Sequence, residues 1–134
     1  MYQHRLLISE LEDAVRRGSQ EKRVETLRRV TDLFLGDNER LSEEQIQVFD
    51  DVLGHLMTRM ESKALIELSE RLAPINNAPI KVVHTLACDD EIAIAGPVLS
   101  LSDRLTTPDL IEIALAKSQS HLLAIANEAV SARL

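Results

Sequence analysis

Apolar residues recur three or four positions apart along most of the chain, a spacing that places their side chains on one face of an α-helix. Sustained alternation of apolar and polar residues is absent, as are Asn-Gly and Asp-Gly hairpin signals, so strands are not expected. The spacing predicts eight helices, over 3–16, about 19–35, 42–60, 62–72, 79–86, 89–101, 107–117 and 118–132. The chain is therefore expected to be all-α.

Several predicted boundaries coincide with residues that start or stop helices. Ser42 and Gln45 have the spacing of a capping box, in which each side chain accepts a hydrogen bond from the other residue's backbone N–H. Pro74 disfavours helical geometry at the residue before it and is expected to end the fourth helix. Thr107 followed by Pro108 predicts an N-cap and first helical residue for the seventh helix.

The sixth and eighth predicted helices carry further expectations. Acidic residues 89–91 are expected to open the sixth helix, where negative charge suits the positive end of the helix dipole. Pro97 in its interior removes one helical hydrogen bond and is expected to kink it. The apolar face expected for the last helix consists of Leu122, Ile125, Ala126 and Val130.

A triplet of an acidic residue, Arg and Leu occurs three times, at 39–41, 70–72 and 103–105. Its copies are offset by 31 and then 33 residues. Apolar residues occupy matching positions around each copy: Phe34 and Leu35, Leu65 and Ile66, and Val98 and Leu99 before it, and Phe49 and Val52, Ile80 and Val83, and Ile113 and Ala116 after it. A period in this range is typical of stacked two-helix repeats.

The repeats predict three tandem two-helix units, at about 19–58, 61–87 and 89–117, with flanking helices at 3–16 and 118–132. Each unit has an apolar face that it cannot bury alone, so stacking of the units is expected to supply the core. We expect one domain, 1–134, with the right-handed superhelix of a HEAT/ARM-like α-solenoid. A more globular bundle of the same helices is the alternative, because the units differ in length.

Composition limits the cellular setting. The 134 residues are 45% hydrophobic, which suits a domain with a core, and no apolar run approaches the length that crosses a bilayer. Charge comes too early at the N-terminus for a secretory signal, and Cys88 is the only cysteine. We therefore expect a cytoplasmic protein with no disulfide.

Net charge is −7 and is unevenly distributed. Residues 1–35 hold seven Lys and Arg against six Asp and Glu, residues 36–73 hold four against nine, and residues 74–134 hold four against seven. Nucleic acid is not expected as a partner, because its binding depends on cations that neutralise phosphates. The basic residues between Arg16 and Arg29 alternate with acidic ones, which favours a solvated helix face over a binding patch.

Several segments resemble one family: ERLAP at 70–74, NAP at 77–79, VV at 82–83, LA at 86–87, IAGPVL at 94–99, LIEIA at 110–114 and HLLAIA at 121–126. They are similar to the proteobacterial proteins grouped as domain of unknown function 2336, from about Glu61 to Ala126 and more weakly toward the N-terminus. The resemblance implies a HEAT-like fold, a bacterial cytoplasmic setting and no established activity. It also implies that the chain is the N-terminal part of a longer protein. The likeness fades at Asn127 and Glu128, where the family pattern leads us to expect an arginine.

The arginines of the triplets, Arg40, Arg71 and Arg104, are candidate interaction residues. They could line one surface and offer guanidinium groups to an acidic partner. The alternative, which we favour, is structural: each stem covers a repeat junction and each charge pairs with a nearby carboxylate or helix C-terminus.

Histidine and cysteine residues suggest two further kinds of site. His84 and Cys88, like Asp51 and His55, lie four residues apart and could share a helix face, but two ligands do not make a metal site. His121 could accept a phosphoryl group if its imidazole is partly exposed among polar neighbours. The favoured alternative is a polar first-turn residue that anchors the last helix by hydrogen bonds.

No phosphate-binding loop, nucleophile elbow or other catalytic motif occurs, and neither an enzyme activity nor a cofactor is expected. We predict a non-catalytic helical-repeat domain that binds a protein partner, with basic or amphipathic helical partners favoured by the acidic charge. The alternative is a bacterial signalling module in which His121 handles phosphate or a small ligand. Self-association through exposed repeat edges is a third hypothesis.

Overall fold

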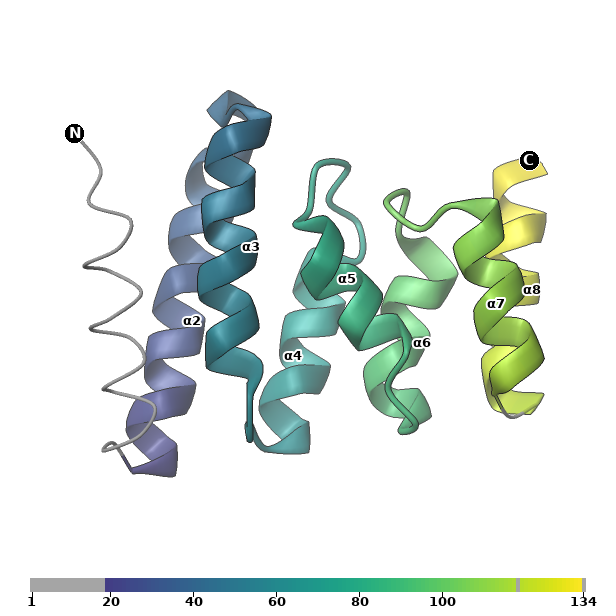
Figure 1. Ribbon diagram of the computed structural model, residues 1–134, viewed down its shortest axis with the longest axis horizontal. Coiled ribbons are helices and arrows are strands. Elements are labelled where there is room, and N and C mark those ends of the chain that lie inside the picture. The colour runs from purple at the N-terminus through teal and green to yellow at the C-terminus, as the bar shows by residue number, and fades with distance from the viewer. Residues whose placement is uncertain (1–18, 118, 134) are drawn as a thin grey trace. The chain divides into compact units, whose positions relative to one another are not determined.

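The computed structural model describes residues 19–117 and 119–133, and side chains up to Asn127 (Figure 1). Its helices are α2 (Gln20–Asp37), α3 (Glu43–Met57), α4 (Ser62–Leu72), α5 (Ile80–Ala87), α6 (Ile92–Leu101), α7 (Thr107–Ala116) and α8 (Gln119–Arg133), with a short 3-10 helix, η1 (Asn38–Arg40), after α2. The described residues form no strand, which confirms the all-α prediction. The helix predicted over 3–16 lies outside them. None of the helices in this part of the chain is both long enough and apolar enough to cross a membrane.

The capping side chains start α2 and α3 as predicted, although α2 continues to Asp37 and not only to residue 35, and α3 ends at Met57 and not at residue 60. Ser19 Oγ accepts a hydrogen bond from the Lys22 backbone N–H at 3.2 Å and starts α2. The capping box of α3 is present, with Ser42 Oγ 3.2 Å from the Gln45 N and Gln45 Oε1 2.9 Å from the Ser42 N. α4 has the predicted bounds and ends two residues before Pro74.

Two predicted helix starts are wrong. α6 begins at Ile92 and not at residue 89, because the Asp89 carboxylate accepts a hydrogen bond from the Glu91 N–H at 2.8 Å and holds 89–91 in a turn. α7 is capped by Thr106 and not by Thr107, because Asp109 lies three residues after Thr106 and completes a capping box with it. Pro97 lies inside α6, as predicted.

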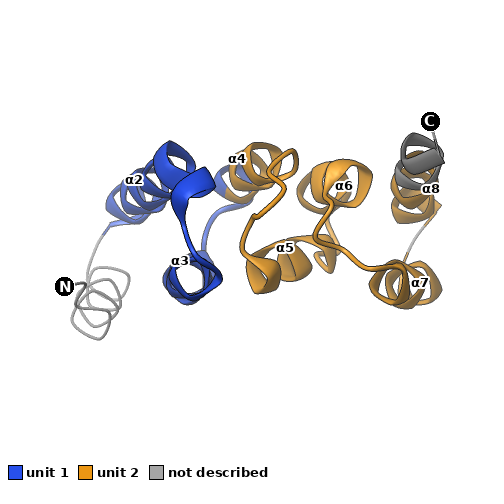
Figure 2. Cartoon of the chain, turned by 90° about the horizontal axis from the view of Figure 1, so that it is seen from above, with its two compact units in different colours: residues 1–64 blue, residues 65–134 orange. Residues whose placement is uncertain are grey.

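The chain divides into two compact units, 1–64 and 65–134, with the division inside α4 (Figure 2). In the described part of the first unit, α2 packs against α3. The rings of Phe34 and Phe49 meet edge to face, with centroids 5.4 Å apart, and join the two helices. The buried apolar residues of this unit are Val24, Leu27, Val30, Phe34, Ile46, Val52, Leu53, Leu56, Met57, Met60 and Ala64.

In the second unit, α6 packs against both α5 and α8, and α7 packs against α8. Seen from above, α6 and α8 lie in one row and α5 and α7 in another (Figure 2). The core of this unit is aliphatic and contains Leu68, Leu72, Ala73, Ala78, Val82, Val83, Leu86, Ala87, Ile94, Ala95, Val98, Leu99, Leu105, Ile113 and Ala124.

The predicted apolar face of α8 is wrong. His121 and Ala124 are buried, whereas Leu122 is 42% exposed and Ala126 is exposed. Ile125 is half-buried, and the side chain of Val130 lies outside the described part. Hydrogen bonds explain the rotation of the helix, because the imidazole of His121 and the carbonyl oxygen of Ala124 both have polar partners on the α6 side.

Candidate functional site

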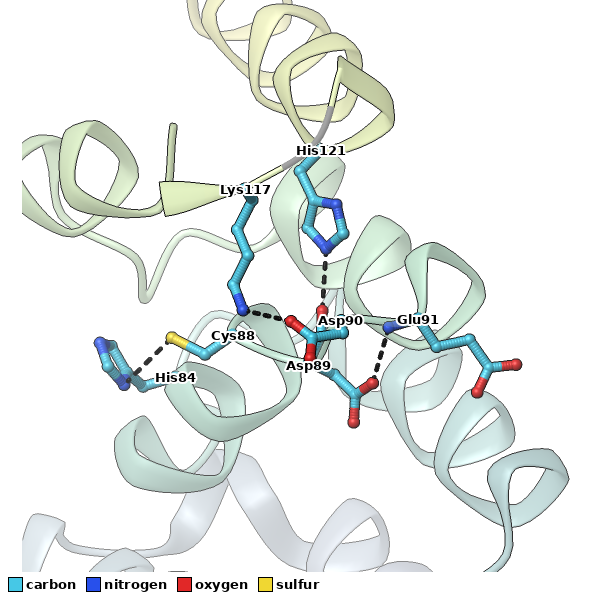
Figure 3. A network of polar contacts seen from close by, with 7 residues as sticks. All are labelled: His84, Cys88, Asp89, Asp90, Glu91, Lys117 and His121. Atoms are coloured by element: carbon cyan, nitrogen blue, oxygen red, sulfur yellow. Dashed lines mark hydrogen bonds and ion pairs between the residues drawn. The ribbon is translucent and has the colours of Figure 1, made fainter. Parts of the chain in front are cut away.

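Seven polar residues from two connections of the second unit meet in one place (Figure 3). The α5–α6 connection and the helix ends beside it supply His84, Cys88, Asp89, Asp90 and Glu91, and the α7–α8 connection and the first turn of α8 supply Lys117 and His121. We call these residues the polar cluster. Its members lie up to 37 positions apart in the sequence, so the fold brings them together.

His121 is the buried anchor of the polar cluster. It is 1% exposed, and its Nε2 lies 2.8 Å from the carbonyl oxygen of Asp89. Because a carbonyl oxygen can only accept, Nε2 carries the proton that is donated. The expectation of a partly exposed imidazole is therefore wrong, and the anchoring role is confirmed. The hypothesis that His121 handles phosphate remains a prediction, without the exposure that motivated it.

Lys117 and Asp90 form the outer contact of the polar cluster, with Lys117 Nζ 2.6 Å from Asp90 Oδ1. The hydrogen bond from Lys117 lowers the pKa of Asp90, and the same contact raises the pKa of Lys117. The carboxylate is 94% exposed, so solvent screens the pair and its contribution to stability is small. The pair and the His121 bond together tie the α7–α8 connection to the α5–α6 connection.

Cys88 and His84 lie side by side at the C-terminal end of α5. Cys88 Sγ lies 3.9 Å from His84 Nδ1. Burial raises the pKa of the Cys88 thiol, and although Lys117 opposes this shift, Glu112 and Asp109 add to it. A thiol with a raised pKa is mostly protonated at neutral pH and is a poor nucleophile. Among the residues that the structure describes, no three His, Cys, Asp or Glu side chains are grouped so that they could hold a metal ion.

The three arginines of the repeated triplet occupy different environments. Arg104, in the α6–α7 connection, donates from Nε to the carbonyl oxygen of Ala78 at 2.7 Å. This bond joins the connections that follow α4 and α6, and its acceptor is a backbone carbonyl, whereas the structural interpretation of the triplet expected a carboxylate or a helix C-terminus. Arg71 is half-buried in the last turn of α4. Arg40 is exposed in η1 and forms no hydrogen bond or ion pair with any described residue.

Large apolar side chains are exposed on the last two helices. On α7, Ile111 is 55% and Leu115 is 85% exposed, and on α8, Leu122 and Leu123 are exposed at 42% and 67%. Sequence reasoning missed Ile111 and Leu115 and assigned Leu122 to the core. The sequence did contain a signal for this exposure. Over 110–115 every residue except Glu112 is apolar, so α7 is apolar on every side. A short helix at the surface can bury only one face, and the remaining apolar side chains must be exposed.

Two open hollows in the first unit offer no specific chemistry. One runs along α2 and is lined by Arg29, Asp32, Leu33, Gly36 and Asp37. The other lies where α2 meets the connection before α4 and is lined by Gln20, Glu21, Val24, Glu25, Arg28, Glu61 and Lys63. Both hollows mix cations with carboxylates, so neither selects a ligand of one charge.

Comparisons of the chain with protein-family models, with curated proteins and with solved structures find no match. The resemblance to domain of unknown function 2336 stays a prediction based on the segments between Glu61 and Ala126. Function therefore has to be inferred from the geometry of the described residues.

Proposed function

We propose that this protein is a non-catalytic interaction domain of the bacterial cytoplasm that binds another protein through its helical surface. One contrast supports the proposal. Three polar candidates of the second unit form hydrogen bonds that hold its connections together: His121, Lys117 and Arg104. Four apolar side chains of α7 and α8 are left at the surface, where a protein partner could bury them: Ile111, Leu115, Leu122 and Leu123.

A HEAT-like solenoid is the architecture that we propose for the repeats. The two rows formed by α5 to α8 in Figure 2 support it, because stacked helix pairs produce such rows. The bond from Arg104 to Ala78 also supports it, since it joins one predicted repeat to the preceding one. Solenoids of this kind provide extended surfaces for partners without any catalytic group.

Three features support a non-catalytic role. The Cys88 thiol has a raised pKa, His121 is buried against a backbone carbonyl, and Asp90 is paired with Lys117. None of these groups combines exposure with an activated protonation state, as a nucleophile or general base requires.

Affinity capture from the native cytoplasm tests the proposal. The bait is the chain as it stands, compared with a double variant, Ile111→Gln with Leu115→Gln, and with Leu33→Gln as a matched control. Leu33 is 67% exposed on α2, so its substitution changes surface apolarity to a similar degree at another place. We expect a stoichiometric protein partner that the double variant loses and Leu33→Gln retains. Recovery of no protein above background with the unmodified chain would contradict the proposed function.

A further inference from the structure

We propose that the outer face of α7, centred on Ile111 and Leu115, binds an amphipathic helix with basic flanks supplied by a partner protein. The inference rests on the proposed function and adds to it the location of the surface and the chemistry of the partner. The packing of α7 and the charges around it carry the proposal.

Ile111 and Leu115 lie one helical turn apart, so their side chains are neighbours on the same face of α7. Ile113, which points in another direction, is 3% exposed and faces the core. Pro108, one turn before Ile111, is also exposed, so the apolar stripe from Pro108 to Leu115 spans seven positions, about 10 Å along the helix axis. A stripe of this length suits the anchors that a partner helix presents at i, i+3, i+4 and i+7.

The charge that is available around this stripe is negative. Glu112 is exposed beside Leu115, and Asp103 is exposed just before α7. Neither carboxylate forms a hydrogen bond or an ion pair with another residue in the described ranges. The cations that flank α7 are both engaged, Arg104 with the Ala78 carbonyl oxygen and Lys117 with Asp90. A cationic partner would therefore find complementary charge at the edge of the apolar stripe.

The same charges disfavour other occupants. A second copy of this chain in a two-fold interface would present the same acidic surface, with Glu112 and Asp103, from both sides, at a cost in repulsion. Nucleic acid and anionic bilayers would meet the same negative charge. A basic amphipathic helix gains from both features, because its apolar stripe covers Ile111 and Leu115 while its lysines or arginines reach the acidic edge.

A labelled helical peptide of Leu, Lys and Ala, with its leucines in one stripe, is the probe. Binding is followed by fluorescence anisotropy, with two comparison peptides. One carries Glu in place of every Lys, and the other keeps the composition but disperses the leucines around the helix. We expect the striped basic peptide to bind more tightly than either. Leu115→Gln should weaken its binding roughly tenfold or more, and Glu112→Gln roughly two- to fivefold, with Leu33→Gln within about twofold of the unmodified chain.

The possible outcomes separate this inference from the proposed function. Equal binding of the dispersed and striped peptides, or of the acidic and basic ones, would overturn the inference. The inference would also be overturned if Leu33→Gln weakened binding of the striped peptide while Leu115→Gln left it unchanged. In that case the chain would still be an interaction domain, but it would bind through another face. A dimer in sedimentation that Leu115→Gln abolishes would assign the face to a second copy and overturn the choice of partner. Absence of peptide binding together with absence of a captured protein would remove both proposals.

Discussion

At the scale of single residues, His121 shows how a polar side chain can fix a helix more firmly than the leucines beside it. Its imidazole fills a buried position, and its Nε2 donates to the Asp89 carbonyl oxygen at 2.8 Å. Leu122 and Leu123 are displaced to the surface by the same rotation of α8. A helix register set by one buried hydrogen bond cannot be found from apolar spacing, because the spacing identifies only the apolar face.

Replacement of His121 by Phe should destabilise the protein by about 2 kcal/mol, because it leaves a buried carbonyl without its donor while keeping a ring of similar shape. Urea denaturation followed by circular dichroism measures the change in the free energy of unfolding. Leu123→Ala is the control, since an exposed leucine on the same helix should contribute less than about 0.5 kcal/mol. Equal stability of His121→Phe and the unmodified chain would show that the hydrogen bond does not hold α8 in place.

Cys88 provides a residue-scale prediction that depends on pH. Because burial raises the pKa of its thiol, alkylation by iodoacetamide should follow an inflection at higher pH in the folded chain than in the same chain in urea. Lys117→Met should move the folded inflection higher still, since the ammonium group lowers the thiol pKa. The native thiol keeps its proton to higher pH than the unfolded one, so its contribution to stability is lost as pH rises through the folded pKa. An inflection at or below that of the unfolded chain would contradict the prediction.

At the scale of elements, the helix boundaries that were predictable are those set by side chains within a few residues. The Ser42 capping box and the bounds of α4 are of this kind. The boundaries that were wrong involve a choice between neighbouring residues of similar type. Thr106 and Thr107 both suit an N-cap, and the reciprocal bonds with Asp109 select Thr106. Asp89 suits a helix start as well as a turn, and its bond to the Glu91 N–H selects the turn.

The cap of α7 can be tested directly. Thr106→Ala should cost about 1 kcal/mol of stability, whereas Thr106→Ser, which keeps the hydroxyl, should cost much less. The backbone hydrogen bond from Thr106 is the main reason why the pKa of Asp109 is lowered, and the side-chain contact adds to it. Thr106→Ala keeps this backbone N–H and removes only the side-chain contact, so a titration of the Asp109 carboxyl by NMR should show a small rise of its pKa toward the ordinary value. An unchanged titration with unchanged stability would mean that the capping box is not formed in solution.

At the scale of the whole molecule, the helical class follows from apolar spacing, but the candidate sites depend on contacts across the fold. The polar cluster joins residues 27 and 32 positions apart through the Lys117–Asp90 and His121–Asp89 contacts. Nothing in the spacing of those residues along the chain distinguishes them from ordinary surface polar groups. The three triplet arginines show the same limit, since one pattern in the sequence leads to an exposed Arg40 and a hydrogen-bonded Arg104.

A comparison of substitutions at Arg104 and at Arg40 tests whether the triplet stabilises the fold or binds a partner. Arg104→Met keeps much of the stem but removes the donor to Ala78, so it should cost about 1–2 kcal/mol of stability and speed hydrogen exchange near that carbonyl and in α7. Arg40→Met changes an exposed side chain and should alter the free energy of unfolding by less than about 0.5 kcal/mol. Exchange mass spectrometry and urea denaturation on the three proteins measure both effects. If Arg104→Met instead folds with unchanged stability and loses the captured partner, the arginine serves binding, and the tie between neighbouring repeats has to be sought in their apolar contacts alone.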